Sequence, residues 1–248
     1  MRARFHPDDT RLERENAQHG IGLEGGLDRQ RFERLYPNTV ARSTKVLLVG
    51  CGGIGSYTAA ILARMGIGSI TLVDFDRVED TNVATQDLPV GYIGLLKVEA
   101  IEGCIFSINP NVDVTLYSTH FAPRHLSKDQ ILIAAVDSIK VRQEIYKVFE
   151  AQASPGQILI DPRMGAESFE LWVIRRGSEF EQEYKRSLFD PTPRAELPCG
   201  ARAIAYTGAF AGAITASAVR RVMMEPTWET WVVGDVGTMR MQVLREIK

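Results

Sequence analysis

Residues 45–76 read KVLLVGCGGIGSYTAAILARMGIGSITLVDFD, and this stretch decides the fold class. An apolar run at 46–49 leads into a glycine-rich turn, a helical pattern covers 56–65, and a second apolar run ends at Asp74. Glycines in such a turn let backbone N–H groups approach a phosphate, and the N-terminus of the following helix adds a partial positive charge. The stretch therefore predicts a strand, turn, helix and strand that bind a nucleotide.

Four glycines and one acidic residue carry this prediction. The glycines of the turn are Gly50, Gly52, Gly53 and Gly55. Asp74 follows the first of them by 24 positions, near the roughly 20-residue offset at which a carboxylate reaches a ribose hydroxyl. A glycine pattern alone is weak evidence, but with two flanking strands and the acidic residue it indicates a nucleotide site.

The composition is that of an ordinary globular protein. The 248 residues are 45% hydrophobic and 24% charged, which suits one well-buried domain. A formal net charge of −2 gives no reason to expect a nucleic-acid partner. Three widely spaced cysteines without a CxxC pair favour a reducing, cytoplasmic location and argue against a cysteine zinc site.

Neither a signal peptide nor a membrane span is expected. Residues 1–20 carry charges throughout and lack an apolar core. The uncharged, Ala- and Gly-rich segment 203–219 is shorter than the roughly 20 residues that a transmembrane helix needs. We interpret it as part of a helix at 201–223 that packs against a sheet.

Strands alternate with helices over most of the chain. The predicted strands lie near residues 46–49, 70–74, 113–117, 131–136 and 158–160. The predicted helices between them lie near residues 56–65, 97–106 and 139–150. This alternation indicates a mostly parallel sheet. Residues 169–175 follow the last strand too closely for a crossover helix, which predicts an antiparallel hairpin, and a terminal strand pair is expected near 231–233 and 239–244.

The predicted fold class is therefore α/β: a Rossmann-like, doubly wound mixed sheet, mostly parallel, with antiparallel strands at its C-terminal edge. Residues 1–44 are predicted to form an N-terminal arm with a short helix near 28–35, and residues 45–248 the nucleotide-binding domain. The polar segment 177–200 contains three prolines, and we predict a long irregular loop there. Loops of this length in a compact domain are often functional.

A collinear set of motifs accompanies Asp74. The motifs are Asp74-Phe75-Asp76, Asn82, Gln86, Gly94-Leu95-Leu96-Lys97, Ile108-Asn109-Pro110, Val136-Asp137 with Arg142, and Cys199-Gly200. Their order resembles the ubiquitin-activating-enzyme-like superfamily of ThiF/MoeB-type adenylyltransferases, which includes the adenylating enzymes of thiamin and molybdopterin biosynthesis. The resemblance covers roughly residues 28–224, most of the chain.

The resemblance implies a site for ATP and magnesium. Members of the superfamily join AMP to the C-terminal glycine carboxylate of a ubiquitin-like or sulfur-carrier protein. By resemblance, Asp74 holds the ribose, and Asp76 belongs to the same nucleotide site. Asn82 and Gln86 are implied to contact phosphate groups.

Two more residues receive catalytic roles by the resemblance. Lys97 is implied to stabilise charge at the α-phosphate, and Asp137 to bind magnesium. These residue types suit the chemistry, because a carboxylate that attacks a phosphate creates negative charge that a lysine and a metal stabilise. The alternatives are a solvated surface lysine at Lys97 and a helix N-cap before Ile139 at Asp137.

The resemblance also implies a homodimer in which an arginine of an N-terminal helix reaches the ATP site of the partner subunit. Arg29, in the sequence Asp28-Arg29-Gln30, matches that arginine. Arg31 and Arg34 lie close enough in the sequence to be alternatives, and a plain solvated basic face is a further one.

A cysteine in the predicted loop is a candidate nucleophile. Cys199 matches the position of a loop cysteine that forms a covalent link with the carrier protein in thiamin-type enzymes. A thiolate attacks an acyl-adenylate readily, although a cysteine is often just a small buried hydrophobe. Ser187, in the same predicted loop, is a second candidate, with no adjacent base evident.

The chain departs from the family pattern at two places. Thr85 stands where the family usually has an arginine, so one phosphate-binding cation is missing unless Arg77 or Arg29 replaces it. The paired zinc cysteines of the family fall on Tyr184 and Ser187, so we expect no zinc.

We therefore predict a stand-alone, homodimeric, ATP-dependent adenylating enzyme that activates a small ubiquitin-like or sulfur-carrier protein, with a conjugating enzyme as a candidate further partner. Three alternatives stay open. They are a tRNA-modifying cyclising dehydratase of the same superfamily, an NAD-dependent oxidoreductase that uses the same nucleotide fold, and a non-catalytic scaffold, which Thr85 favours.

Overall fold

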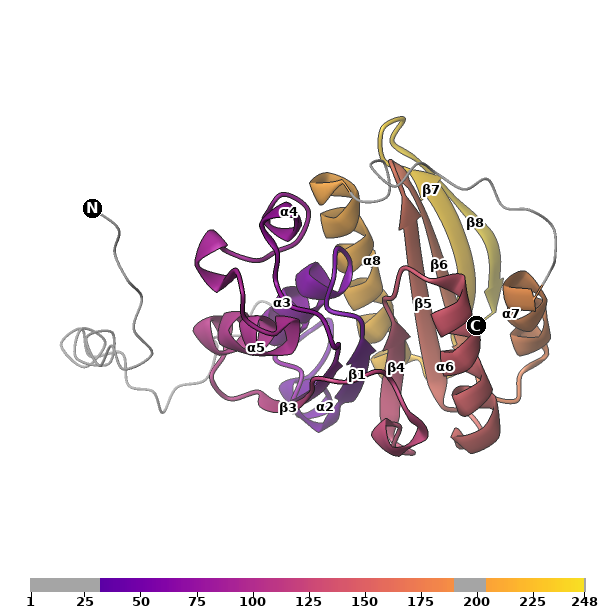
Figure 1. Ribbon diagram of the computed structural model, residues 1–248. Helices are drawn as coiled ribbons and strands as arrows, with labels where there is room; N and C mark the ends of the chain where they lie inside the picture. Colours follow the sequence, from indigo (N-terminus) through magenta and orange to yellow (C-terminus); the bar gives the residue numbers. More distant parts are fainter. Residues whose placement is uncertain (1–31, 190–203, 248) are drawn as a thin grey trace, which may run out of the picture.

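The computed structural model describes residues 32–189 and 204–247, so Arg29 and Cys199 lie outside the described residues. Within those ranges the strands form one eight-stranded sheet in the order β3-β2-β1-β4-β5-β6-β7-β8 (Figure 1). The strands are β1 (Lys45–Val49), β2 (Ser69–Val73), β3 (Asp113–Tyr117), β4 (Gln130–Ala134), β5 (Ile158–Gly165), β6 (Ser168–Arg175), β7 (Glu229–Asp235) and β8 (Arg240–Ile247). Strands β3 to β5 pair in parallel and β5 to β8 pair antiparallel, which confirms the predicted mixed sheet and both hairpins.

Helices cover both faces of the sheet, as a doubly wound fold requires (Figure 1). They are α2 (Asn38–Ser43), α3 (Gly55–Met65), α4 (Asp80–Val83), α5 (Lys97–Ile108), α6 (Ile139–Gln152), α7 (Glu179–Phe189) and α8 (Ala205–Met224). Helices α3, α5 and α8 lie over one face, and α6 and α7 over the other. None of the helices in the described part of the chain is long and apolar enough to cross a membrane.

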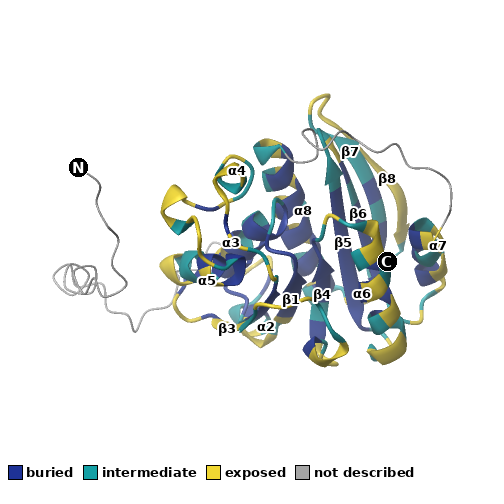
Figure 2. Ribbon diagram, viewed as in Figure 1, coloured by how far each residue is buried: buried dark blue, intermediate teal, exposed yellow. Residues whose placement is uncertain are grey.

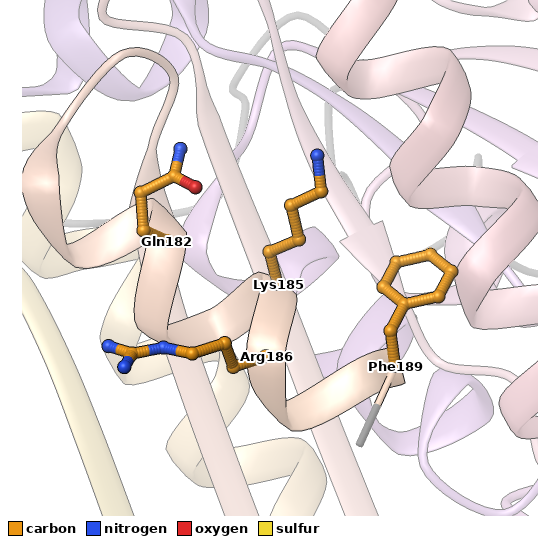
Figure 3. A pocket seen from close by; sticks show the side chains of 4 residues that line it. All are labelled: Gln182, Lys185, Arg186 and Phe189. Atoms are coloured by element: carbon orange, nitrogen blue, oxygen red, sulfur yellow. The ribbon is translucent and has the colours of Figure 1, made fainter. Parts of the chain in front are cut away.

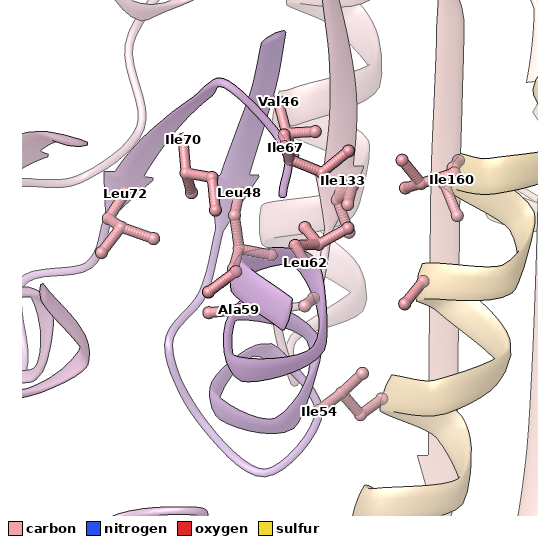
Figure 4. Packing of buried hydrophobic residues seen from close by; sticks show 14 of the residues in the cluster. Val46, Leu48, Ile54, Ala59, Leu62, Ile67, Ile70, Leu72, Ile133 and Ile160 are labelled. Carbon is pink, nitrogen blue, oxygen red and sulfur yellow. The ribbon is translucent and has the colours of Figure 1, made fainter. Parts of the chain in front are cut away.

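Two apolar clusters hold the helices on the sheet. Along β1, Val46 and Leu48 belong to the cluster that contains residues of α3 (Figure 4). Leu47 and Val49 belong to the cluster that contains residues of α6, because successive side chains of a strand alternate between faces. The uninterrupted apolar run of β1 is thus that of a strand covered on both sides. Burial is concentrated in the central strands, while β8 is almost wholly exposed (Figure 2).

Helix α8 carries glycines where it meets α3, and a side chain at these positions would not fit. A Cβ at Gly212 would lie 2.7 Å from the Cβ of Tyr57, and a Cβ at Gly208 would clash with the carbonyl oxygen of Gly53. The N-terminal half of α8 therefore packs directly on the glycine turn that precedes α3.

Part of the predicted loop at 177–200 is wrong, because residues 179–189 form helix α7. Phe180, Tyr184 and Leu188 are spaced four residues apart and are buried against the sheet. The predicted helix near 28–35 is not seen in its described part, since residues 32–35 form a turn in which Leu35 N donates to Phe32 O at 2.8 Å. Helix α2 was not predicted.

Candidate active site

The carboxyl ends of three neighbouring strands bring the predicted site residues together. Strand β1 lies between β2 and β4, with Val49 paired to Val73 on one side and to Ala134 on the other. The glycine turn, Asp74 and the loop after β4 therefore start side by side. The chain crosses from β3 to β4 over this point, which is where α/β sheets bind ligands.

Backbone atoms pack so tightly against the glycine turn that side chains at Gly50 and Gly55 would not fit. Gly50 has a φ of 95°, and a Cβ there would lie 2.8 Å from the carbonyl carbon of Ala135. A Cβ at Gly55 would clash with the carbonyl oxygen of Gly50. At Gly52 the nearest atom to a Cβ would be Gln86 Nε2 at 3.9 Å, so the turn has room on that side. Helix α3 then begins without a side-chain cap; Ser56 N donates to Gly52 O at 3.0 Å, and the positive end of the helix dipole lies at the turn.

Asp74 is held in place by two backbone N–H groups. Its Oδ2 accepts from Cys51 N at 2.7 Å, and its Oδ1 accepts from Asp76 N at 2.8 Å. The carboxylate therefore lies against the glycine turn and is partly exposed. Burial, and then Asp74, raise the pKa of the Cys51 thiol, so this cysteine stays protonated and is a packing residue.

Lys97 is buried at the start of α5, so the alternative of a solvated surface lysine is wrong. The residue is 7% exposed, and its Nζ lies 2.8 Å from Asp76 Oδ2. Its backbone N also donates to Asp76 O at 2.9 Å. These contacts fix a cation beside the segment that contains Asp74.

The two predicted phosphate ligands lie in and after α4. Asn82 Oδ1 accepts from Glu79 N at 3.0 Å as part of the capping box of α4. Gln86 N donates to Asn82 O at 2.8 Å, and within the described residues Gln86 Oε1 is buried without a hydrogen-bond partner. Thr85 Oγ1 donates to Asn82 O at 3.4 Å, while Arg77 Nη1 donates to Gly94 O at 2.8 Å. Replacement of the missing arginine by Arg77 stays a prediction.

Asp137 lies exposed in the loop between β4 and α6. The alternative that it caps α6 is wrong, because the N-cap is Ser138, whose Oγ accepts from Val141 N at 3.4 Å. The loop is held by Arg142, which donates from Nη1 to Ala134 O at 2.8 Å and from Nη2 to Val136 O. The Asp137 carboxylate is thus presented from a fixed backbone.

A buried polar cluster behind this loop was missed by the sequence analysis. Asp161 is fully buried and accepts from Arg142, from Arg163 and from the hydroxyl of Tyr184. Desolvation, and then Arg163, lower the pKa of Arg142 to about 9, and desolvation raises the pKa of Tyr184 to about 12. The available signal was the pair of charged residues inside the apolar strand ILIDPRMG.

An exposed aromatic pair also escaped the sequence analysis. Phe75, directly after Asp74, is 53% exposed, and its ring lies 4.1 Å from that of His120, centroid to centroid. The two rings follow the neighbouring strands β2 and β3. They form an aromatic surface beside Asp74 that the core does not use.

A surface hollow over α7 contains none of these residues. Figure 3 shows its lining side chains, which are Gln182, Lys185, Arg186 and Phe189. Lys185 is paired with Glu150 at 2.6 Å. Among the residues that the structure describes, no group of three or more His, Cys, Asp or Glu side chains could hold a metal ion.

Fold and site together define a Rossmann-like α/β protein with a glycine turn of the nucleotide-binding kind. The profile of the ThiF family matches residues 32–227. The chain therefore belongs to the ThiF family, which confirms the resemblance on which the site residues were assigned.

The curated relatives are of two kinds, enzymes named as activators of ubiquitin-like modifiers and enzymes named as tRNA dehydratases. The chain is 28% identical over 217 residues to ubiquitin-like modifier-activating enzyme 5 of Branchiostoma floridae, covering 71% of this chain and 53% of that protein. It is 34% identical over 141 residues to the tRNA threonylcarbamoyladenosine dehydratase of Haemophilus influenzae, covering 51% and 54%. The chain thus spans about half the length of these relatives.

Solved structures show the same fold at lower identity. Escherichia coli MccB with MccA-N7isoASN matches with a TM-score of 0.68 at 17% identity, over 88% of this chain and 72% of that one. Escherichia coli tRNA N6-threonylcarbamoyladenosine dehydratase in complex with AMP matches with a TM-score of 0.62 at 23% identity, over 79% and 93%. MccB has also been solved with ATP.

Proposed function

We propose that this protein is an ATP-dependent adenylating enzyme that joins AMP to the C-terminal glycine carboxylate of a small ubiquitin-like or sulfur-carrier protein. The observation that carries the proposal is the buried cation Lys97, which is ion-paired to Asp76 within the segment that follows Asp74. A buried cation next to a glycine turn is what charge development on a phosphate requires.

The residues present fit ATP. The glycine turn has room at Gly52, where Gln86 Nε2 would be the atom nearest to a Cβ, at 3.9 Å, and this amide nitrogen can donate to a phosphate oxygen. The N-terminus of α3, which has no side-chain cap, adds the positive end of the helix dipole. In this proposal the turn and Gln86 bind phosphates, together with the Asn82 amide. Asp74, fixed by Cys51 N, holds the ribose.

Asp137 is the proposed magnesium ligand. Its carboxylate is exposed at the carboxyl end of β4, and a hard divalent cation prefers such an oxygen. Magnesium, when bound with ATP, would neutralise part of the charge on the phosphates. Arg142 keeps the loop in place through the carbonyls of Ala134 and Val136.

In the proposed reaction a substrate carboxylate oxygen attacks the α-phosphorus of ATP, and the bond to the pyrophosphate oxygen breaks. Lys97 Nζ turns from Asp76 toward the α-phosphate oxygen as negative charge builds there. Until then the ion pair with Asp76, at 2.8 Å, holds the lysine in one orientation. Pyrophosphate leaves, and an acyl-adenylate remains.

Other parts of the proposal rest on residues outside the described ranges or on the family alone. We propose a cytoplasmic homodimer in which Arg29 of one subunit completes the ATP site of the other. Cys199 is the proposed acceptor of the activated acyl group, and a conjugating enzyme is a candidate to receive it next. Ser187 is a poorer nucleophile, because it lies on α7, where its Oγ donates to Tyr184 O at 2.7 Å.

ATP–pyrophosphate exchange with purified candidate carrier proteins tests the proposal directly. We expect exchange that requires ATP, Mg²⁺ and an intact carrier C-terminus. Absence of exchange together with absence of ATP binding would overturn it. An NAD-dependent oxidoreductase would instead bind NAD in preference to ATP, and a non-catalytic scaffold would keep its biological activity in Lys97→Ala.

A tRNA-modifying dehydratase is the second candidate, because the Haemophilus influenzae enzyme is 34% identical over 141 residues. Such an enzyme adenylates a carboxylate on a modified base rather than on a protein. The net charge of −2 disfavours an RNA partner. Exchange stimulated by bulk tRNA and not by any carrier protein would select this candidate.

A further inference from the structure

Asp161 is the centre of the buried polar cluster. It lies in β5 and is fully buried. Its Oδ2 accepts from Arg163 Nε at 2.8 Å and from the Tyr184 hydroxyl at 3.0 Å, while its Oδ1 accepts from Arg142 Nη1. A buried carboxylate with several charge-assisted bonds holds all of its donors in one geometry.

On one side the cluster leads to the phosphate-binding turn. Arg142 donates to the carbonyls of Ala134 and Val136, which lie on either side of Ala135. The Ala135 carbonyl in turn closes the protein side of the turn at Gly50, where a Cβ would clash with it. Asp137 follows directly. Arg142 therefore fixes both the floor of the turn and the backbone that presents the proposed magnesium ligand.

On the other side the cluster leads to α7. Tyr184 donates to Asp161, and Arg163 Nη2 donates to Ser187 Oγ at 3.4 Å. These are the two positions at which the resemblance places zinc cysteines. Hydrogen bonds thus attach α7 to β5 where relatives of the zinc-containing type would use a metal. Helix α7 ends at Phe189, just before the segment that carries Cys199.

The charges of the cluster balance. Arg163 Nη1 also donates to Glu170 Oε2 at 3.1 Å, so two guanidinium groups face two carboxylates. Glu170 Oε1 accepts from the indole N–H groups of Trp172 at 2.8 Å and Trp231 at 2.9 Å. The carboxylates of Asp161 and Glu170 therefore find their hydrogen-bond donors within the protein.

We propose that Asp161 is a positioning residue for adenylation, which holds the Asp137 loop through Arg142 and couples that loop to α7 through Tyr184. The proposal rests on the proposed function for its catalytic part. Asp161 does not touch a substrate. Its role is to keep Arg142 turned toward the two carbonyls, so that Asp137 faces the phosphates without reorganisation.

Tyr184→Phe is the central variant, and Tyr146→Phe is its matched control. Both hydroxyls are buried and each donates to a buried carboxylate, Tyr184 to Asp161 at 3.0 Å and Tyr146 to Glu181 at 3.2 Å. The two rings are neighbours, with centroids 5.5 Å apart. Only the Tyr184 hydroxyl contacts the carboxylate that holds Arg142. A change specific to Tyr184→Phe therefore reports on the coupling and not on the loss of a buried hydroxyl.

Hydrogen exchange of the free protein is the first readout. We expect faster amide exchange over residues 135–138 in Tyr184→Phe and an unchanged rate there in Tyr146→Phe. The Mg²⁺ dependence of ATP–pyrophosphate exchange is the second. We expect the Mg²⁺ concentration for half-maximal rate to rise about threefold in Tyr184→Phe and tenfold or more in Asp161→Asn.

Two results would overturn the coupling. One is an equal response of Tyr184→Phe and Tyr146→Phe at residues 135–138, and the other is a fall in melting temperature with no change in the Mg²⁺ profile. If Asp161→Asn fails to fold, the milder tyrosine pair still decides the question. If the wild type neither binds ATP nor exchanges pyrophosphate, the proposed function fails, whereas the hydrogen-exchange comparison still tests the coupling by itself.

Discussion

Lys97→Met tests the proposed chemistry with little disturbance of the fold. The Lys97 side chain is 9% exposed, whereas its partner Asp76 is 46% exposed at the side chain. Because water can solvate Asp76 once the ion pair is lost, we expect the substitution to lower the free energy of unfolding by only about 1 kcal/mol. Loss of a preorganised charge-stabilising group at a reaction centre slows the reaction about 100- to 1,000-fold. The effect on rate should thus far exceed the effect on stability.

The assay is ATP–pyrophosphate exchange at saturating ATP, measured beside thermal unfolding. Lys45→Met is the control, because Lys45 is also paired to an aspartate, Asp129, but lies exposed at the opposite end of β1. We expect exchange in Lys45→Met to equal that of the wild type. A folded Lys97→Met protein whose exchange rate stays within threefold of the wild type would refute the assignment of Lys97 to the α-phosphate.

Three further predictions address the turn, the base and pH. Gly55→Ala places a methyl group on the carbonyl of Gly50, so urea unfolding should show a loss of about 3 kcal/mol or more, and wild-type stability would contradict this. Phe75→Ala removes an aromatic ring that can stack on a base. Titration calorimetry should therefore show ATP binding weakened about 5- to 100-fold and tripolyphosphate binding unchanged. Equal losses of affinity for both ligands would exclude stacking. Desolvation, and then Arg124, lower the pKa of His125 below its ordinary value of 6.5, so stability present above that pH is lost as pH falls. The fall in melting temperature between about pH 7.5 and 5.5 should shrink in His125→Phe, and an undiminished fall would assign it to other groups.

The parallel half of the sheet could be predicted closely from local sequence. The predicted strand at 113–117 coincides with β3, the run at 46–49 lacks only the first residue of β1, and the run at 70–74 is shifted from β2 by one residue. Strands β1 and β2 are buried on both faces and are therefore apolar runs, which are followed directly by Gly50 and by Asp74. The hairpin of β5 and β6 followed from the short connection between them.

Helix α7 shows where such reasoning fails. Its charged residues and the prolines that follow suggested a loop, although Phe180, Tyr184 and Leu188 recur at helical spacing. The charged pair in ILIDPRMG could have indicated a buried polar group, but the partners of Asp161 could not be predicted. The cluster depends on the β5–β6 register, which places Asp161 opposite Trp172, and on the rotation of α7 that turns Tyr184 inward. Neither is encoded in a local pattern.

The contact between Gly50 and Ala135 links ligand binding to global unfolding. The turn keeps its shape only while β1 and β4, about 85 residues apart in the chain, are paired. A nucleotide therefore binds the folded state alone, and at 100 times its Kd it would stabilise that state by about 2.7 kcal/mol. For a chain of this size that corresponds to a rise in melting temperature of roughly 5–11 °C. A panel of nucleotides screened by thermal unfolding would thus rank its cofactor preference before any carboxylate substrate is in hand.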